Sequence, residues 1–165
     1  MNREISPSEA RAGKILGASD RSDFVSVTIG DQLFGIPVLQ VQDVLGPQRI
    51  TRIPLAPPEV AGSLNLRGRI VTAIDIRTRL RLPAHPEGRQ GMSVVCDYQG
   101  ELYSLLVDAV GEVLSLESGA AERNPATLDP VWREVSAGIY RLDGRLLVVL
   151  DVARVLDFSA RAAAA

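Results

Sequence analysis

The chain carries an internal repeat, which constrains its architecture more than any other feature of the sequence. Residues 61–80 read AGSLNLRGRIVTAIDIRTRL, and residues 137–156 read AGIYRLDGRLLVVLDVARVL. Seven positions match at a constant separation of 76 residues, namely Ala61/Ala137, Gly62/Gly138, Leu66/Leu142, Gly68/Gly144, Arg69/Arg145, Asp75/Asp151 and Leu80/Leu156. Upstream, residues 33–45 match residues 102–114 more loosely. Two copies are too few for a solenoid, so they predict a pseudo-twofold pair of small subdomains with a groove between them.

The length of the chain suits one domain with loose ends. Residues 1–22 mix charged and small residues without periodicity, and residues 159–165 are rich in alanine. We expect both segments to be flexible and the domain to cover residues 23–158, with residues 83–91 as a linker between the two copies. A domain of this size buries enough surface to fold without a disulfide or a metal.

The cysteine content and the hydropathy pattern indicate a reducing compartment. Cys96 is the only cysteine and cannot form an internal disulfide, which is typical of a reducing environment. The N-terminal residues lack the apolar stretch of a secretory signal. The longest aliphatic run, residues 146–150, is far too short to span a bilayer. We therefore expect a soluble cytoplasmic protein.

Alternating apolar residues between tight turns predict a mainly β fold. Val25, Val27 and Ile29 alternate with polar residues before a Gly30-Asp31 turn, which is a hairpin signal. Pro37 has no N–H to donate, so the next strand should end near it. Further strands are expected at residues 41–45, 63–66, 70–76, 93–96, 102–107, 112–116, 136–142 and 146–152. About five short strands per copy predict two five-stranded β-barrel subdomains related by the duplication, with short helices.

Two repeat aspartates are interpreted as helix caps. Asp75 and Asp151 each follow an apolar strand and precede a helical stretch, where aspartate accepts hydrogen bonds from free backbone N–H groups. The alternative is a catalytic site of paired carboxylates, which this sequence context does not favour. A further short helix is expected from Glu59, because it follows two prolines.

The charge pattern argues against nucleic acid as a partner. The formal net charge is −2 and aromatic residues are few, whereas nucleic-acid-binding barrels are basic and carry aromatic platforms. Seven arginines nevertheless gather in one stretch with two acidic residues, at positions Arg49, Arg52, Arg67, Arg69, Arg77, Arg79 and Arg81. Arginine suits the pairing of carboxylates at a protein interface. The alternative is a GC-rich genome that encodes arginine in place of lysine.

The sequence offers no set of residues for catalysis. The only histidine, His85, lies between Ala84 and Pro86 in the expected linker. Spacings typical of zinc or calcium sites and glycine-rich phosphate loops are absent from the sequence. We therefore expect a protein without enzymatic activity, metal or cofactor.

Three blocks of the sequence resemble the CheW-like domain family. The first is F-x4-I-G-D-x2-F-G-I-x-V-x2-V-x-D-V over residues 24–44, the second is GSLNLRGRIVTAIDIR over residues 62–77, and the third is the closing DGRLLVVLDVARVL. The resemblance covers residues 23–158 and implies two SH3-like five-stranded barrels packed around a shared core.

The resemblance also implies an adaptor function in bacterial chemotaxis. Members of the stand-alone form couple the cytoplasmic hairpin tips of chemoreceptors (methyl-accepting chemotaxis proteins) to the regulatory domain of the histidine kinase CheA. That regulatory domain is itself CheW-like, so the implied partners include ring neighbours and other copies of the chain. The implied location is the cytoplasm, at receptor arrays on the inner face of the membrane.

By matching positions, the resemblance places the receptor-binding groove at Val38, Val41, Asp43, Leu66, Arg67 and Gly68. A helical receptor tip would be recognised by apolar walls and a few charges. Val38 and Val41 supply the wall or, alternatively, belong to the core. Arg67 pairs with a receptor carboxylate or, alternatively, with Asp43. The chain departs from the family at Asp43, where glutamate is usual, and near Thr72, where proline is usual.

The implied contact with the kinase or with ring neighbours lies in the loop of residues 117–134. Its apolar members are Leu128, Val131 and Trp132, and a lone tryptophan in a polar loop is typical of a binding hot spot. The alternative is that Trp132 folds back onto the second subdomain.

Two other functions stay open at this stage. One is a scaffold of the same fold for a different sensory kinase. The other is a small-molecule binder, which an enclosed apolar cavity in the groove would support and a shallow groove would oppose.

Overall fold

The computed structural model describes residues 20–85 and 91–157 of the chain. The predicted tail 159–165, residues 1–19 of the predicted N-terminal segment and residues 86–90 of the predicted linker lie outside the described residues. Within them the strands are β1 (Arg21–Ile29), β2 (Gln32–Pro37), β3 (Val41–Leu45), β4 (Val60–Leu66), β5 (Arg69–Asp75), β6 (Met92–Tyr98), β7 (Glu101–Val107), β8 (Ala109–Glu117), β9 (Ser136–Leu142) and β10 (Arg145–Leu150). The helices are α2 (Ile76–Arg79), α3 (Pro130–Val135) and α4 (Val152–Val155), with short 3-10 turns η2 (Val38–Gln40) and η3 (Ser118–Ala120).

The structure departs from the predicted elements at the N-terminus of the domain and at Glu59. Strand β1 begins at Arg21, inside the predicted flexible segment, because Arg21 and Ser22 pair with Glu117 and Leu116 of β8. The helix expected from Glu59 is absent, since the chain enters β4 at Val60 instead. There the N–H of Asp75 donates to the Glu59 carbonyl, at 2.8 Å, so Glu59 lies against the end of β5.

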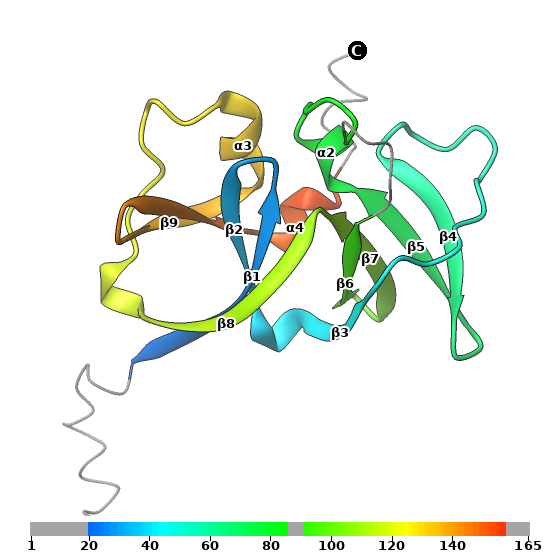
Figure 1. Ribbon diagram of the computed structural model, residues 1–165, viewed down its shortest axis with the longest axis horizontal. Coiled ribbons are helices and arrows are strands. Elements are labelled where there is room, and N and C mark those ends of the chain that lie inside the picture. Colours follow the sequence, from blue (N-terminus) through cyan, green and yellow to red (C-terminus); the bar gives the residue numbers. More distant parts are fainter. Residues whose placement is uncertain (1–19, 86–90, 158–165) are drawn as a thin grey trace, which may run out of the picture.

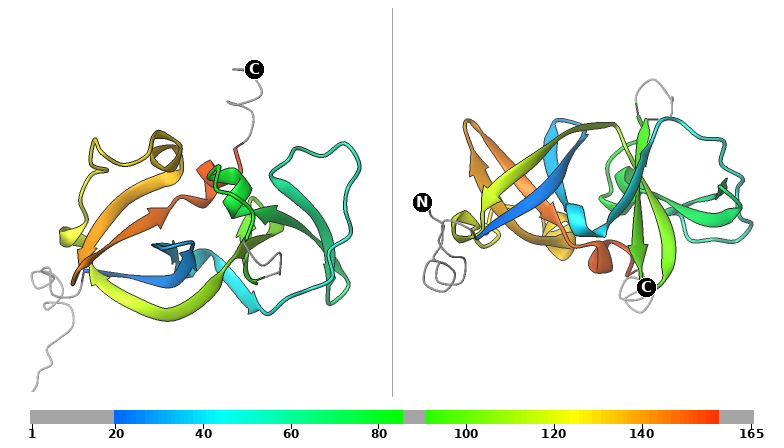
Figure 2. Two further views of the ribbon diagram at one scale, coloured as in Figure 1. Left: turned by 45° about the horizontal axis from the view of Figure 1, so that its top comes forward. Right: turned by 90° about the horizontal axis from the view of Figure 1, so that it is seen from below.

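The strands form two five-stranded sheets that lie side by side as two lobes (Figure 1, Figure 2). Sheet A has the order β8-β1-β2-β10-β9, and sheet B has the order β3-β6-β7-β5-β4. The first repeat supplies β1–β5 and the second β6–β10, so each sheet joins two strands of one repeat to three of the other. The repeats meet in the parallel pairs β2–β10 and β7–β5 and in the antiparallel pairs β1–β8 and β3–β6. Strands β5 and β6, which flank the predicted linker, both belong to sheet B, so the repeat boundary is not the boundary between the two sheets.

The sheets are open, so the prediction of two β-barrels holds only for their strand content. Strands β8 and β9 are the edges of sheet A, and β3 and β4 are the edges of sheet B. One isolated β-bridge, Glu122–Ile139, joins the chain after β8 to the opposite edge strand, β9. Another, Thr51–Ser63, joins the chain after β3 to the opposite edge strand, β4. The sheets do not close into barrels beyond these bridges. Strand β3 ends before Gly46-Pro47, where proline has no N–H to donate to a neighbouring strand, and β8 ends where η3 begins.

These bridges explain one pair of repeat glycines. Gly62 and Gly138 have φ angles of 151° and 145°, which favour glycine. A Cβ atom on Gly62 would collide with the Thr51 carbonyl oxygen, and one on Gly138 would crowd the Glu122 carbonyl oxygen. Glycine at each of these two positions therefore lets the segment that carries Thr51 or Glu122 approach the edge strand closely.

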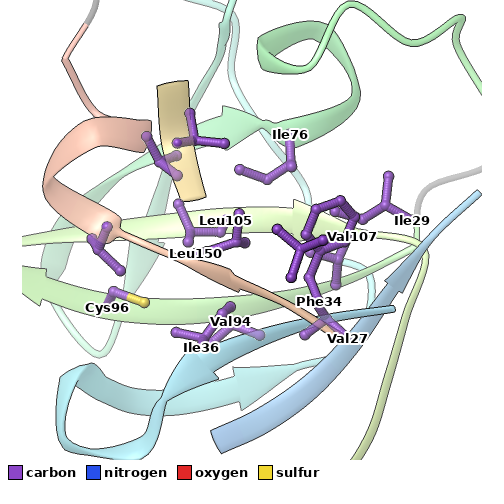
Figure 3. Packing of buried hydrophobic residues seen from close by; sticks show 14 of the residues in the cluster. Val27, Ile29, Phe34, Ile36, Ile76, Val94, Cys96, Leu105, Val107 and Leu150 are labelled. Carbon is purple, nitrogen blue, oxygen red and sulfur yellow. The ribbon is translucent and has the colours of Figure 1, made fainter. Parts of the chain in front are cut away.

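A central hydrophobic cluster joins the two sheets. Figure 3 shows Val27, Phe34 and Ile36 of sheet A packed against Val94 and Cys96 of sheet B. These side chains are fully buried. Burial raises the pKa of the Cys96 thiol to about 12, so the thiol stays protonated and unreactive at neutral pH.

Arg79 ties the two sheets together at the junction where α2 and α4 lie (Figure 1). Its side chain is 3% exposed, and its Nε and Nη2 donate to the carbonyls of Val155 and Arg154 in α4, both at 2.9 Å. Glu134 is 3.7 Å from Nη1. Burial lowers the pKa of Arg79, and the Glu134 carboxylate opposes that shift.

The inner clusters of the two sheets differ in side-chain size at equivalent positions. Phe24 of β1 pairs with Pro37 and Leu114, and Ser93 of β6 pairs with the equivalent Leu106 and Leu45. Sheet A packs Phe24, Tyr140, Leu147 and Val149 where sheet B has Ser93, Leu64, Val71 and Ala73. The smaller side chains leave a cavity of about 40 Å³, lined by Gly46, Gln48, Ile50, Gly91, Ser93 and Leu106. The buried Ser93 hydroxyl has no hydrogen-bond partner among the described residues.

We expect Ser93→Val to stabilise the fold by about 1 kcal/mol, because it replaces an unpaired buried hydroxyl with methyl groups that fill part of this cavity. Chemical denaturation of the variant measures the change. Ser104→Val is the matched control, since Ser104 is equally buried and does not line the cavity. Overpacking should make the control less stable than wild type. Equal stabilisation by both variants would contradict the assigned cavity.

Candidate partner-binding surface

The predicted groove begins where the chain crosses from sheet A to sheet B. Strand β2 ends at Pro37, as predicted, and η2 carries the chain across to β3. Val38 and Val41 are partly buried and pack against the central cluster. Each valine therefore contributes to the core, the predicted alternative, and keeps part of its surface exposed, while its role as a receptor-binding wall stays a prediction.

Leu39 is the apolar residue that sequence reasoning missed on this surface. Its side chain in η2 is 96% exposed, next to Val38. The sequence signal was the run Val38-Leu39-Gln40-Val41, because a single 3-10 turn cannot turn every apolar side chain inward. An almost fully exposed leucine between two partly buried valines gives this surface an apolar contact point.

The structure brings Asp43 and Arg67 together. Arg67 Nη2 donates to Asp43 Oδ2 at 3.1 Å, and the N–H of Val44 donates to Asp43 Oδ1 at 2.8 Å. The predicted alternative, an intramolecular pair, is therefore formed. The side chains are 77% and 28% exposed for Arg67 and Asp43, and such exposed pairs contribute little to folding. One guanidinium nitrogen makes this contact, so the fork can also meet a partner's carboxylate.

The β4–β5 turn holds Arg67 in an unfavourable backbone conformation. Leu66 pairs with Arg69 across a two-residue turn, in which Arg67 and Gly68 have φ angles of 53° and 86°. The N–H of Gly68 donates to Asn65 Oδ1 at 2.9 Å. A positive φ costs a non-glycine residue about 1–2 kcal/mol, and such strain concentrates at functional sites. Leu66 itself packs into the inner cluster of sheet B.

The segment predicted to contact the kinase contains a helix. Asp129 caps α3 by accepting a hydrogen bond from the N–H of Val131 at 2.8 Å, and Pro130 occupies the first turn. The sequence signal was Asp-Pro, which favours a helix start. Trp132 is partly buried and packs edge-on against Phe34, with ring centroids 5.6 Å apart, and Leu128 also packs against the central cluster. Trp132 therefore folds back, as in the alternative, but onto Phe34 of β2, in the first repeat, rather than onto the second repeat alone. Its role as a partner contact stays a prediction.

Asp75 and Asp151 act as helix caps, as interpreted from the sequence. Asp75 accepts a hydrogen bond from the N–H of Thr78 in α2, and Asp151 accepts one from the N–H of Arg154 in α4, both at 3.3 Å. The two carboxylates therefore have equivalent structural roles at the ends of β5 and β10.

We expect Asp75→Ala and Asp151→Ala each to cost about 1 kcal/mol of stability, because each removes an N-cap. Thermal melts measure this effect. Binding of partners at the η2 surface should persist at temperatures where the variants are folded. Unchanged stability combined with lost binding would assign the aspartates to a binding site instead.

Comparison with known proteins assigns the fold to a family. A family model described as the CheW-like domain matches residues 23–160. The chain belongs to this family. The chemotaxis protein CheW of Klebsiella aerogenes is 29% identical over 148 residues, covering 90% of this chain and 89% of the relative. The probable chemotaxis protein CheW of Rhizobium etli is 30% identical over 142 residues, covering 86% and 90%. The crystal structure of the scaffolding protein TtCheW from Thermoanaerobacter tengcongensis is similar, with a TM-score of 0.72, 26% identity and coverage of 83% and 86%.

In this CheW-like domain a hollow of about 470 Å³ lies in the β3–β4 loop. It is lined by Arg52, Ile53, Pro54, Leu55, Ala56, Pro57, Pro58, Val60 and Ala61. Leu55 there is fully exposed, with a φ angle of 65°. Neither this hollow nor the small cavity of sheet B is an enclosed apolar cavity at the predicted groove, so neither supports the small-molecule alternative.

Residues 20–85 and 91–157 contain no group of three or more histidine, cysteine, aspartate or glutamate side chains able to hold a metal ion. Among the described helices, none has the length and apolar character needed to cross a membrane.

Proposed function

We propose that this chain is a non-enzymatic adaptor that couples the cytoplasmic tips of chemoreceptors to the histidine kinase CheA in chemotaxis signalling. Membership of the CheW-like domain family and the names of its relatives support the pathway. The observation that carries the receptor contact is the surface around η2, where the exposed Leu39 lies beside Val38, and β3 supplies Asp43 to the strained Arg67.

The receptor contact is a helix lying against an apolar strip with a charged end. Leu39 and the exposed parts of Val38 and Val41 supply the apolar contact, as in helix-in-groove recognition. Arg67 projects from the turn formed with Gly68 and pairs with a carboxylate on the receptor hairpin, while Asp43 and Leu66 brace it. A fixed charge beside an apolar strip sets the register of the bound helix.

The second contact, with the CheA regulatory domain or a ring neighbour, is assigned to α3 and the loop before it. Leu128, Val131 and Trp132 lie there, each partly buried, so their exposed edges are available to a partner. The β4–β5 turn, which carries Arg67, and the α3 segment lie at opposite ends of the molecule (Figure 1). An adaptor of this kind acts in the cytoplasm, at receptor arrays on the inner face of the membrane.

Separate titrations of the full chain test this function. The titrants are a receptor hairpin fragment and the isolated CheA regulatory domain, and calorimetry reports each affinity. We expect saturable binding to both. Binding to the hairpin without binding to the CheA domain would assign the chain to a different sensory kinase. Binding to neither would contradict the adaptor function.

A further inference from the structure

Asp108 lies at the second crossover between the sheets, between β7 of sheet B and β8 of sheet A. Its N–H donates to the Thr28 carbonyl of β1 at 3.1 Å. The N–H of Gly30, in the β1–β2 turn, donates to Asp108 Oδ2 at 2.7 Å. Asp108 is thus attached to a hairpin of sheet A by both its backbone and its side chain.

Arg77 of α2, which follows β5 of sheet B, forms a bidentate ion pair with the same carboxylate, and we call this pair the crossover clamp. Its Nε donates to Asp108 Oδ1 at 2.9 Å and its Nη2 to Oδ2 at 2.6 Å, while Nη1 donates to the Pro83 carbonyl at 2.8 Å. The two side chains are only 13% and 19% exposed. The hydrogen bond from Arg77 holds the pKa of Asp108 below its usual value against the opposing effect of burial. The pair is therefore ionised and bidentate, the strongest form of such a contact.

The crossover at η2 is the repeat equivalent of the one at Asp108, and the matched residues there do not form an ion pair. In the repeat alignment Asp108 corresponds to Leu39, and Arg77 corresponds to Ala153. Neither replacement carries charge, and Leu39 is almost fully exposed. The two crossovers have therefore diverged, one into a clamped junction and the other into an open apolar surface. Both contact one core, because Val107 beside Asp108 belongs to the central cluster against which Val38 and Val41 pack.

We infer that Arg77 and Asp108 are positioning residues for receptor binding, because they clamp one crossover and so fix the relative orientation of the two sheets. This inference rests on the proposed function. The proposed receptor surface spans both sheets, since η2 extends from sheet A whereas Arg67 projects from sheet B. A ligand that touches both sheets binds tightly only if their relative orientation is already set, because ordering them on binding costs affinity.

The test compares hairpin affinity for Asp108→Asn and Arg77→Lys in the full chain. Glu122→Gln is the matched control, because it breaks another arginine–carboxylate pair, Arg141–Glu122 at 3.0 Å, that is exposed and remote from the crossover. We expect Asp108→Asn to weaken hairpin binding by about fivefold or more and to speed hydrogen exchange at the Gly30 amide. The control should bind like wild type, and Asp108→Glu should recover part of the affinity.

A double-mutant cycle with Arg67→Asn separates positioning from general destabilisation. If the clamp acts by placing Arg67, then Asp108→Asn should weaken binding less in the Arg67→Asn background than in wild type. Additive losses, or wild-type affinity in a folded Asp108→Asn variant, would overturn the inference while leaving the adaptor function intact. Should Asp108→Asn fail to fold, Arg77→Lys decides by the same criteria, since it keeps the charge and removes the bidentate geometry. A wild-type chain that does not bind the hairpin would overturn the adaptor function and this inference together.

Discussion

Replacing Arg67 with glutamate is expected to weaken binding to a receptor hairpin fragment by more than tenfold, or about 1.4 kcal/mol. The fold and the affinity for the CheA regulatory domain should persist. The guanidinium is 77% exposed and contacts Asp43, so a carboxylate at this position would face Asp43 and repel the receptor's acidic group. The repeat equivalent of Arg67 is Asp143, and this divergence at a matched turn favours a partner-specific role for one copy.

Three further variants make this prediction specific. Arg69→Glu changes the net charge equally at an exposed neighbouring position and should bind nearly as wild type. Arg67→Asn removes the charge and relieves the positive φ angle, so it should lose affinity without losing stability. The double variant Arg67→Asp/Asp43→Arg, called the exchange variant, keeps the internal ion pair but moves the positive charge from position 67 to position 43. Recovery of affinity in the exchange variant would show that Arg67 only braces Asp43, and equal loss for both partners would assign Arg67 to the scaffold.

Arg79→Met should cost about 3 kcal/mol of stability, because it leaves two carbonyls of α4 without their charged donors in a buried site. The methionine fills much of the space, so the lost hydrogen bonds dominate the change. Urea denaturation measures the free energy of unfolding. Arg145→Met, at an exposed arginine of β10, is the control and should change stability little. A loss below about 1 kcal/mol for Arg79→Met would show that α2 and α4 are held together by apolar packing alone.

The repeat predicted the strand content well, because its signals are local. Gly68 and Gly144 mark the hairpin turns with positive φ angles, and Asp75 and Asp151 mark the helix caps. Each of these roles depends on a few neighbouring residues, so the sequence pattern contains it. The family resemblance, confirmed over residues 23–160, also rests on these local motifs.

The exchange of strands between the repeats could not be predicted from the repeat itself. An alignment shows which residues are equivalent, but it does not show whether β2 pairs within its own copy or with β10, as Phe34 does with Val148. Long-range side-chain contacts could not be predicted for the same reason. Trp132 reaches Phe34, and Arg77 reaches Asp108, through a fold that the local pattern does not encode.

The residues of the predicted receptor site lie in different environments, and their binding role stays a prediction. Asp43 and Arg67 lie together, yet Leu66 packs inward and Leu39, which was not predicted, is exposed. Apolar type alone does not tell a wall residue from a core residue, because both bury surface, and only the geometry of η2 distinguishes Leu39 from its neighbours.

Simultaneous binding of both partners tests the adaptor account most directly. Receptor hairpin fragments tethered to vesicles are mixed with a fluorescent CheA regulatory domain, and its recruitment is measured as the chain is titrated in. The account predicts no recruitment beyond background without the chain, a rise as the chain is added, and a fall at large excess, when each partner is occupied by a separate copy. Formation of either binary complex to the exclusion of the other, at every concentration of the chain, would contradict it.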